Sequence, residues 1–255
     1  MIPWFQFTTI NIGPIPIQVW GLFVSLGIIL ATVIIWKKAE QKHIDRDLVL
    51  DIIIIALLFG LIFSRLFHIV FYKPVYYLQN PLTVLQVWLG GFSSYGAFFG
   101  AALGFIYIYK KRSIKKSSLP KMLDLFAFGS IYGWIVGRIG CFMIHDHLGK
   151  HTDMWLSIAT PSGSRFEMAL LEIIALIPLA ILFFVYRKKE VFSGWFFSVL
   201  VIYYGILRFV LDFFRASDIV NADARYLGLT PAQYFSVVLV GLGVHFFLKF
   251  RKQKK

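Results

Sequence analysis

Residues 193–214 read SGWFFSVLVIYYGILRFVLDFF, and the only charged side chains in this run of 22 residues are Arg208 and Asp212. A helix needs about 20 mostly apolar residues to cross the ~30 Å hydrocarbon core of a bilayer. No water is available at that depth, so the backbone has to satisfy its own hydrogen bonds, which favours a helix. The run therefore predicts a transmembrane helix that carries two charges.

Runs of this kind recur along the whole chain. Of its 255 residues, 58% are hydrophobic and 15% are charged, whereas soluble domains contain about 25% charged residues. We expect an all-α, polytopic membrane protein with one domain over residues 1–255 and about seven transmembrane helices. The predicted helices cover residues 17–36, 48–72, 90–109, 122–144, 166–186, 193–214 and 230–250.

The net charge of +13 reflects membrane topology, and we expect no nucleic acid among the partners. Of the 26 Lys and Arg residues, 18 lie in the four segments 37–46, 110–121, 187–189 and 249–255, and the alternate loops hold five. Cytoplasmic loops carry the excess of Lys and Arg. We therefore predict that the N-terminus lies outside and the C-terminus in the cytoplasm. Residues 145–165 then form a small extracytoplasmic cap.

Three arginines, Arg65, Arg138 and Arg208, fall inside apolar runs, each in the predicted outer half of its helix. On insertion scales each costs ~2.5–3.5 kcal/mol at a helix centre. A guanidinium keeps its charge and needs an anionic partner. Two interpretations are open. The arginines form ion pairs with buried acids such as Asp212, or they share a pocket and bind the phosphate of a ligand through bidentate contacts.

The strongest local pattern lies in the run quoted first. Tyr204, Arg208, Asp212 and Arg215 fall within about 80° of one another on a helix that turns about 100° per residue. One narrow stripe thus carries a phenol, a carboxylate and two cations. Ionisable groups inside a membrane are functional candidates by default.

Residues 137–149 read GRIGCFMIHDHLG. Two histidines flank Asp146 at a spacing that suits a metal, but no acidic cluster completes the set. We expect no metal site and instead a polar shelf available for proton transfer. The single cysteine, Cys141, excludes an intramolecular disulfide and a CxxC motif, and a buried cysteine usually behaves as a small apolar residue.

Glycines recur at four-residue spacing in two of the runs, and such faces let helix backbones approach closely. We expect them to serve helix packing. They are Gly96, Gly100 and Gly104 in one run and Gly129, Gly133 and Gly137 in the other.

Taken together, these residues resemble the prolipoprotein diacylglyceryl transferase family over most of the chain. The closest match is 204–215, and the match over 137–149 has an arginine and a glycine eleven residues apart. The others are Ile12-Gly13-Pro14, Trp20-Gly21-Leu22, Ser64-Arg65, Trp88 to Gly100, and Gly228-Leu229-Thr230 with Gln233 and Ser236.

The resemblance implies an enzyme of the bacterial cytoplasmic (inner) membrane. It would transfer the diacylglyceryl group of phosphatidylglycerol to the lipobox cysteine thiol of a prolipoprotein, form a thioether and release glycerol phosphate. Its partners would be phosphatidylglycerol, prolipoprotein signal peptides and the bilayer, and it would need no cofactor.

The resemblance also implies roles for eight residues of this sequence. Phosphatidylglycerol would be bound by Arg65, Arg138 and Gly149, and the catalytic residues would be Tyr95, Asp146, Tyr204, Arg208 and Asp212. Tyr95 stands where the family usually has a histidine. The base that deprotonates the thiol is therefore open among Tyr95, Asp146, His145, His147 and another group.

Two other classes of function compete with the transferase. A transporter of anionic lipid would also use intramembrane arginines, but it should contain inverted repeats, and the chain has no convincing internal repeat. A non-catalytic binder of anionic phospholipid is the second, favoured by the substitutions at Tyr95 and Cys141.

Overall fold

The computed structural model describes residues 1–86, 91–219 and 225–253. Its long helices are α1 (Val19–Gln41), α2 (Arg46–Phe71), α4 (Ser94–Lys111), α5 (Leu119–Ile144), α6 (Met168–Tyr186), α7 (Trp195–Leu211) and α8 (Pro231–Lys252). Shorter helices are α3 (Pro74–Gln79) and the 3-10 turns η1 (Pro81–Leu85), η3 (Lys116–Ser118) and η4 (Asp212–Phe214).

Six of the long helices have the length and apolar composition to cross a membrane, namely all except α4 in the described part of the chain. The expectation of an all-α, polytopic membrane protein is confirmed, and each predicted run contains one long helix whose ends agree to within a few residues. The count of seven spans and the placement of the termini stay predictions.

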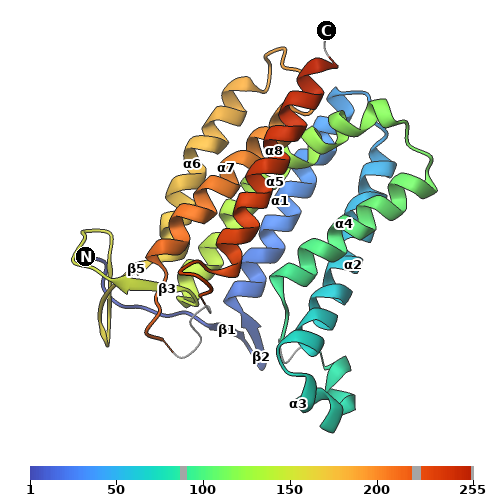
Figure 1. Ribbon diagram of the computed structural model, residues 1–255. Helices are drawn as coiled ribbons and strands as arrows, with labels where there is room; N and C mark the ends of the chain where they lie inside the picture. Colours follow the sequence, from blue (N-terminus) through green and yellow to red (C-terminus); the bar gives the residue numbers. More distant parts are fainter. Residues whose placement is uncertain (87–90, 220–224, 254–255) are drawn as a thin grey trace. The chain divides into compact units, whose positions relative to one another are not determined.

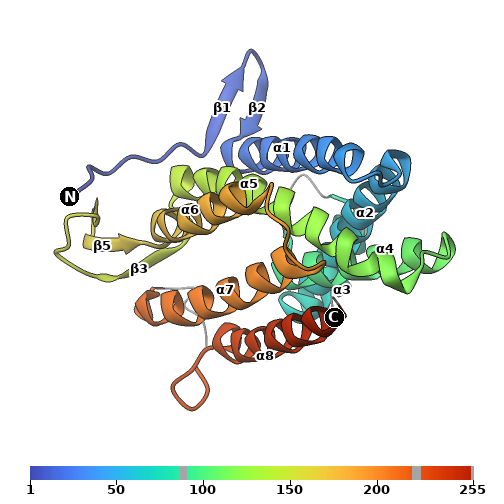
Figure 2. The ribbon, with the colours of Figure 1, turned by 90° about the horizontal axis from the view of Figure 1, so that it is seen from above.

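The chain divides into two compact units, Met1–Ile35 with Pro120–Lys255, and Trp36–Leu119. That residues 1–255 form one domain stays a prediction. In the first unit α5, α6, α7 and α8 run side by side with the first part of α1 (Figures 1 and 2). In the second unit, α2 and α4 are neighbours.

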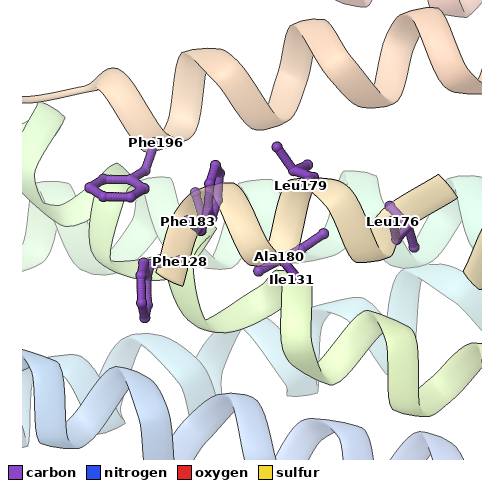
Figure 3. Packing of buried hydrophobic residues seen from close by; sticks show 8 residues of the cluster. Phe128, Ile131, Leu176, Leu179, Ala180, Phe183 and Phe196 are labelled. Carbon is purple, nitrogen blue, oxygen red and sulfur yellow. The ribbon is translucent and has the colours of Figure 1, made fainter. Parts of the chain in front are cut away.

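The core of the first unit lies between α5, α6 and α7 (Figure 3). It is built from large apolar side chains, which include Phe128 and Ile131 of α5, Leu176, Leu179 and Phe183 of α6, and Phe196 of α7. Asp124 of α5 fixes the start of α7, because its carboxylate accepts hydrogen bonds from the backbone nitrogens of Gly194 (2.6 Å) and Phe197 (3.0 Å). These contacts hold three helices in a fixed register.

The segment predicted as a cap forms a small antiparallel sheet. Its strands are β3 (Leu148–His151), β4 (Ile158–Thr160) and β5 (Gly163–Glu167), in the order β3-β5-β4. It connects the end of α5 to the start of α6. A separate hairpin of β1 (Thr9–Ile12) and β2 (Ile15–Gln18) precedes α1, and its turn begins at Gly13, whose φ is +59°.

Five of the six glycines at four-residue spacing lie where two helix backbones touch, and the exception is Gly137, where a Cβ atom would meet nothing within 4 Å. A Cβ atom on Gly133 would come within 2.4 Å of the carbonyl oxygen of Gly27 on α1, and one on Gly100 within 2.2 Å of the carbonyl oxygen of Phe59 on α2. Real Cβ atoms do not approach backbone so closely, so only glycine allows these crossings. The prediction that these glycines serve helix packing is confirmed at both crossings and does not hold for Gly137.

We therefore predict that Gly133→Ala lowers the melting temperature in detergent. The added methyl group forces α1 and α5 apart, and such overpacking costs typically ~1–3 kcal/mol. The matched control is Gly241→Ala on α8, where a Cβ atom would meet nothing within 4 Å. Alanine is the better helix former by ~1 kcal/mol, so the control should melt at or above the wild-type temperature. Equal melting temperatures for the two variants would contradict the close crossing.

Candidate functional site

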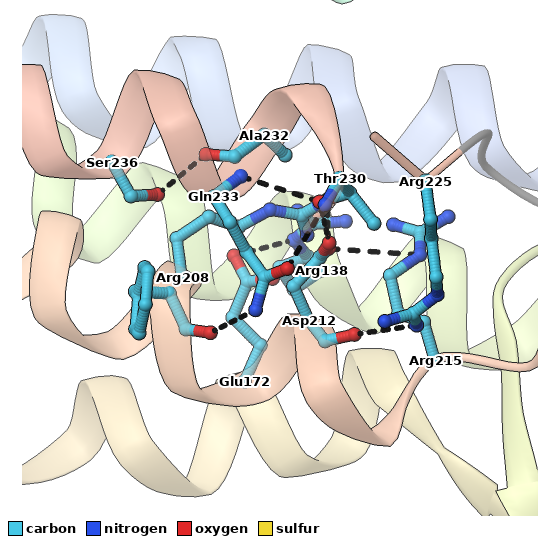
Figure 4. A network of polar contacts seen from close by, with 11 residues as sticks. Arg138, Glu172, Arg208, Asp212, Arg215, Arg225, Thr230, Ala232, Gln233 and Ser236 are labelled. Carbon is cyan, nitrogen blue, oxygen red and sulfur yellow. Dashed lines mark hydrogen bonds and ion pairs between the residues drawn. The ribbon is translucent and has the colours of Figure 1, made fainter. Parts of the chain in front are cut away.

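Polar side chains gather at one end of the helices of the first unit (Figure 4). Arg138 lies in the last two turns of α5, Glu172 near the start of α6, and Arg208 in the last turn of α7. Asp212 follows in η4, beside the start of α8. The segments that meet at this end include residues 145–167 and 212–219, and the basic segments 187–189 and 249–253 lie at the opposite helix ends.

Arg138 is held by a buried carboxylate. Its Nε atom donates to Oε1 of Glu172 at 2.9 Å, and Nε1 of Trp134 donates to the same oxygen at 3.1 Å. Glu172 is only 3% exposed. A buried charge pair of this kind is stable only when both groups stay paired and hydrogen-bonded. The hydrogen bond from Nε therefore fixes the orientation of the Arg138 guanidinium. Its Nη1 atom lies 3.7 Å from Sγ of Cys141.

Asp212 is the centre of a second charged group. Its side chain is fully buried, and Oδ1 lies 3.1 Å from Nη2 of Arg208 and 3.9 Å from Nε of Arg215. Arg225 donates to the backbone carbonyl oxygen of Asp212 at 3.4 Å. The predicted stripe along the end of α7 thus brings these charges together. The ion-pair interpretation is confirmed for Arg208 with Asp212, and Arg138 finds a buried acid that the sequence did not single out.

The first turn of α8 completes the surroundings of Asp212. The hydroxyl of Thr230 donates to Oδ2 of Asp212 and accepts from the backbone nitrogen of Gln233 at 3.3 Å. The backbone nitrogen of Thr230 donates in turn to the side-chain Oε1 of Gln233 at 3.0 Å, which completes a capping box. The Nε2 atom of Gln233 also donates to the carbonyl oxygen of Phe209 at 3.2 Å. Thr230 therefore caps α8 and also donates a hydrogen bond to the carboxylate of Asp212.

Tyr204 lies between the two charged groups. Its ring packs on that of Trp134 with centroids 4.4 Å apart, and its hydroxyl interacts electrostatically with Glu172, Arg208 and Arg138. The phenol predicted from the stripe is therefore close to both arginines. Four of the predicted site residues, Arg138, Tyr204, Arg208 and Asp212, meet in this one region of the first unit.

Arg65 lies in the second unit and holds a loop there. Its guanidinium donates to the backbone carbonyl oxygens of Thr83 (2.6 Å), Val84 (3.1 Å), Gln86 (3.3 Å) and Gly91 (3.1 Å). Gly91 has φ +79°, and a Cβ atom there would lie 2.7 Å from Nη1 of Arg65. The arginine thus fixes the path of the chain after α3. That it binds phosphatidylglycerol in a pocket shared with the other two arginines stays a prediction.

His145 and His147, on either side of Asp146, each contact a different carboxylate. Nδ1 of His147 lies 2.6 Å from Oδ1 of Asp146, and both side chains are partly exposed. His145 is fully buried with Glu167, at 3.0 Å between Nδ1 and Oε2. Burial raises the pKa of Glu167, and the hydrogen bond with His145 opposes that rise. Within residues 1–86, 91–219 and 225–253, no three or more His, Cys, Asp or Glu side chains gather as metal ligands would.

Two predicted site residues have other surroundings. A Cβ atom on Gly149 would lie 2.7 Å from Cβ of Phe166 and from the carbonyl oxygen of Phe214, so this glycine permits a close crossing of backbone segments. The side chain of Tyr95 lies outside what the structure describes. The phosphatidylglycerol role of Gly149 and the catalytic role of Tyr95 stay predictions.

Glu172 is the residue that the sequence reasoning missed. The signal was present, because Glu172 is the single acid inside the apolar run 168–186, and a buried acid in a membrane helix needs a cationic partner. The partner lies 34 residues away on another helix. Its identity therefore depends on how α5 and α6 pack, which the pattern within one run does not specify.

With this geometry in place, comparison with known proteins identifies the relatives. A model of the prolipoprotein diacylglyceryl transferase family matches residues 8–249. A phosphatidylglycerol–prolipoprotein diacylglyceryl transferase of Wolbachia pipientis wMel is 32% identical over 248 residues, covering 93% of this chain and 92% of the relative. Proteins of the same name from Finegoldia magna and Nitrosomonas europaea are 29% and 28% identical, and each alignment covers 95% of this chain and, respectively, 95% and 88% of the relative. The chain therefore belongs to the prolipoprotein diacylglyceryl transferase family.

Proposed function

We propose that this protein transfers the diacylglyceryl group of phosphatidylglycerol to the lipobox cysteine thiol of a prolipoprotein and releases glycerol phosphate. The observation that carries the proposal is the fixed guanidinium of Arg138, held by buried Glu172 in a chain that matches the family over residues 8–249. Its relatives carry the name of this activity and of both substrates.

The reaction makes one bond and breaks one. The thiolate attacks the carbon of the diacylglyceryl moiety that carries the phosphate ester, so a carbon–sulfur bond forms as the bond from this carbon to the phosphate oxygen breaks. The electron pair of the broken bond stays on the phosphate oxygen, and glycerol phosphate leaves. The thiol must first lose its proton, because the thiolate is the nucleophile.

Negative charge develops on the phosphate oxygens as the bond breaks, and fixed guanidinium groups stabilise it in a site of low dielectric constant. We assign this role to Arg138 and Arg208. Glu172 and Asp212 keep the two cations in place before the lipid binds, so little reorganisation is needed during the reaction. Tyr204, which interacts with both arginines, is placed to donate a hydrogen bond to the same phosphate.

For the proton of the thiol we propose the pair Asp146 and His147. The two side chains are 28% and 38% exposed and 2.6 Å apart, so a substrate can reach them, and the carboxylate can orient the imidazole as a general base. His145 is fully buried with Glu167 and is less accessible to a substrate. Tyr95 keeps its predicted place among the catalytic residues.

The protein is a multi-pass membrane protein, and we propose the bacterial cytoplasmic (inner) membrane as its location. The N-terminus and the sheet over residues 148–167 then lie outside, where a prolipoprotein signal peptide presents its cysteine. Lipid would reach the site sideways from the bilayer. Large apolar side chains such as Leu26, Ile29, Ile181 and Val237 are exposed on the long helices, as a lipid-facing surface requires.

We predict that Arg138→Ala lowers kcat for lipidation of a lipobox peptide by about 10²–10³-fold, because removal of one preorganised donor has an effect of that size. Glu172→Gln should lower it by a smaller factor, since the cation remains but its orientation is lost. The assay mixes purified protein, phosphatidylglycerol and the peptide, and follows the peptide mass.

The matched control is Arg46→Ala. Arg46 forms a partly exposed ion pair with Glu40 at 2.8 Å at the start of α2 and lies over the ring of Trp36, and its loss should leave kcat unchanged. The kcat of Asp212→Asn should fall as far as that of Arg138→Ala. Tyr95→Phe tests whether Tyr95 accepts the proton of the thiol. Full activity in Arg138→Ala would exclude the role given to this arginine, and no adduct from the wild-type protein would exclude the proposed function.

The proposed topology predicts which side of the membrane each loop faces. In a Cys141→Ala background, Ser162→Cys in the turn between β4 and β5 should react with a membrane-impermeant thiol reagent on intact cells. Lys188→Cys, between α6 and α7, should react only after permeabilisation. Both positions are exposed, so the two variants differ in sidedness alone. The reverse pattern of labelling would invert the orientation.

A further inference from the structure

Arg165 and Asp218 form an ion pair outside the groups described so far. Arg165 belongs to β5 and its side chain is 5% exposed, whereas Asp218 follows η4 and is 49% exposed. The contact is bidentate, with 3.0 Å from Nη1 to Oδ1 and 2.5 Å from Nη2 to Oδ2. The guanidinium holds the pKa of Asp218 at about 2. The Nη1 atom also donates to the carbonyl oxygen of Gly149 at 3.2 Å.

This ion pair is part of a larger attachment between the sheet and the chain after α7. Gly149 of β3 pairs with Arg215 in an antiparallel bridge, and the backbone nitrogen of Ala216 donates to the carbonyl oxygen of Leu148 at 3.4 Å. The rings of Phe166 and Phe214 meet edge to face with centroids 5.3 Å apart. Residues 214–218 therefore run along β3.

The attached segment leads directly into the polar site. Arg215 is three residues after Asp212 and lies 3.9 Å from its carboxylate. A displacement of residues 214–218 would therefore shift the backbone of Asp212. The distances from its carboxylate to Arg208 and Thr230 would then change. The backbone bridge and the aromatic contact are uncharged and short-ranged. Arg165 with Asp218 is the charged, bidentate part of the attachment, and such pairs set geometry more strictly than single hydrogen bonds.

We propose that Arg165 and Asp218 form a latch that positions Asp212 and Arg215 for catalysis, so that both are positioning residues of the transferase. The inference rests on the proposed function, because it assigns a role within that reaction. Among the described residues His151 also faces the latch, with Nε2 at 3.5 Å from Oδ2 of Asp218. Its ring is half exposed, so it contributes less to the fixed geometry than the buried arginine does.

The test is a double-mutant cycle of Asp218→Asn and Arg165→Gln in the lipidation assay, with the folded fraction of each variant measured by thermal unfolding. Each single variant should lower kcat per folded molecule by about ten- to a hundredfold, since displacement of a catalytic group by about 1 Å has an effect of this order. The KM for phosphatidylglycerol should change little. The double variant should be no worse than the poorer single one, because each change breaks the same contact.

Two further variants separate positioning from stability. Asp218→Glu keeps the carboxylate and should recover part of the lost kcat, which a purely structural role would not predict. Arg165→Lys replaces Arg165→Gln in the cycle if the latter does not accumulate as folded protein. Glu40→Gln, which breaks the partly exposed pair with Arg46, is the matched control and should keep the wild-type kcat.

The outcomes distinguish the latch from the proposed function. If the wild-type protein forms no adduct, the proposed function fails. If the wild-type protein is active and the single variants keep its kcat while only their melting temperatures fall, the pair is structural and the latch is overturned. Factors that simply multiply in the double variant would also overturn it, because independent effects cannot come from one shared contact.

Discussion

The polar site depends on two carboxylates buried beside arginines inside an otherwise apolar bundle. Glu172 fixes Arg138 and Asp212 fixes Arg208, at 2.9 and 3.1 Å. Removing one partner of a buried pair typically costs ~3–5 kcal/mol, because a buried charge is left uncompensated. The helices that carry these groups therefore cannot shift without breaking the pairs. The same contacts that allow four helix ends to converge also fix the positions of two cations.

Close helix crossings make this arrangement possible. Gly27 and Gly133 bring α1 against α5, and the apolar side chains between α5, α6 and α7 fix the neighbours of α5. Arg138 lies on the same helix as Gly133, little more than one turn further along. The packing around Gly133, several residues before Arg138, therefore helps to set the position of Arg138 relative to Glu172.

The sequence predicted the long helices and the polar stripe at the end of α7, but not the pairs of residues that join separate elements. Helix bounds followed from apolar runs, because a membrane-spanning helix must be long and apolar. The stripe from Tyr204 to Asp212 followed from helical periodicity over neighbouring residues, although α7 ends at Leu211 and Asp212 lies in the adjoining turn η4. The pairing of Arg138 with Glu172, and that of Arg165 with Asp218, joins residues 34 and 53 positions apart. Such pairs depend on how separate elements pack, and periodicity within one element carries no information about that.

The double role of Thr230 has a consequence for how the protein tolerates change. Its hydroxyl donates its one hydrogen bond to Asp212, and the hydroxyl oxygen accepts from the first turn of α8. Rotation or axial sliding of α8 would therefore withdraw a hydrogen bond from the carboxylate that holds Arg208. Substitutions far along α8 that rotate or shift the helix would thus disturb the contacts of Asp212 even where the helix itself stays intact.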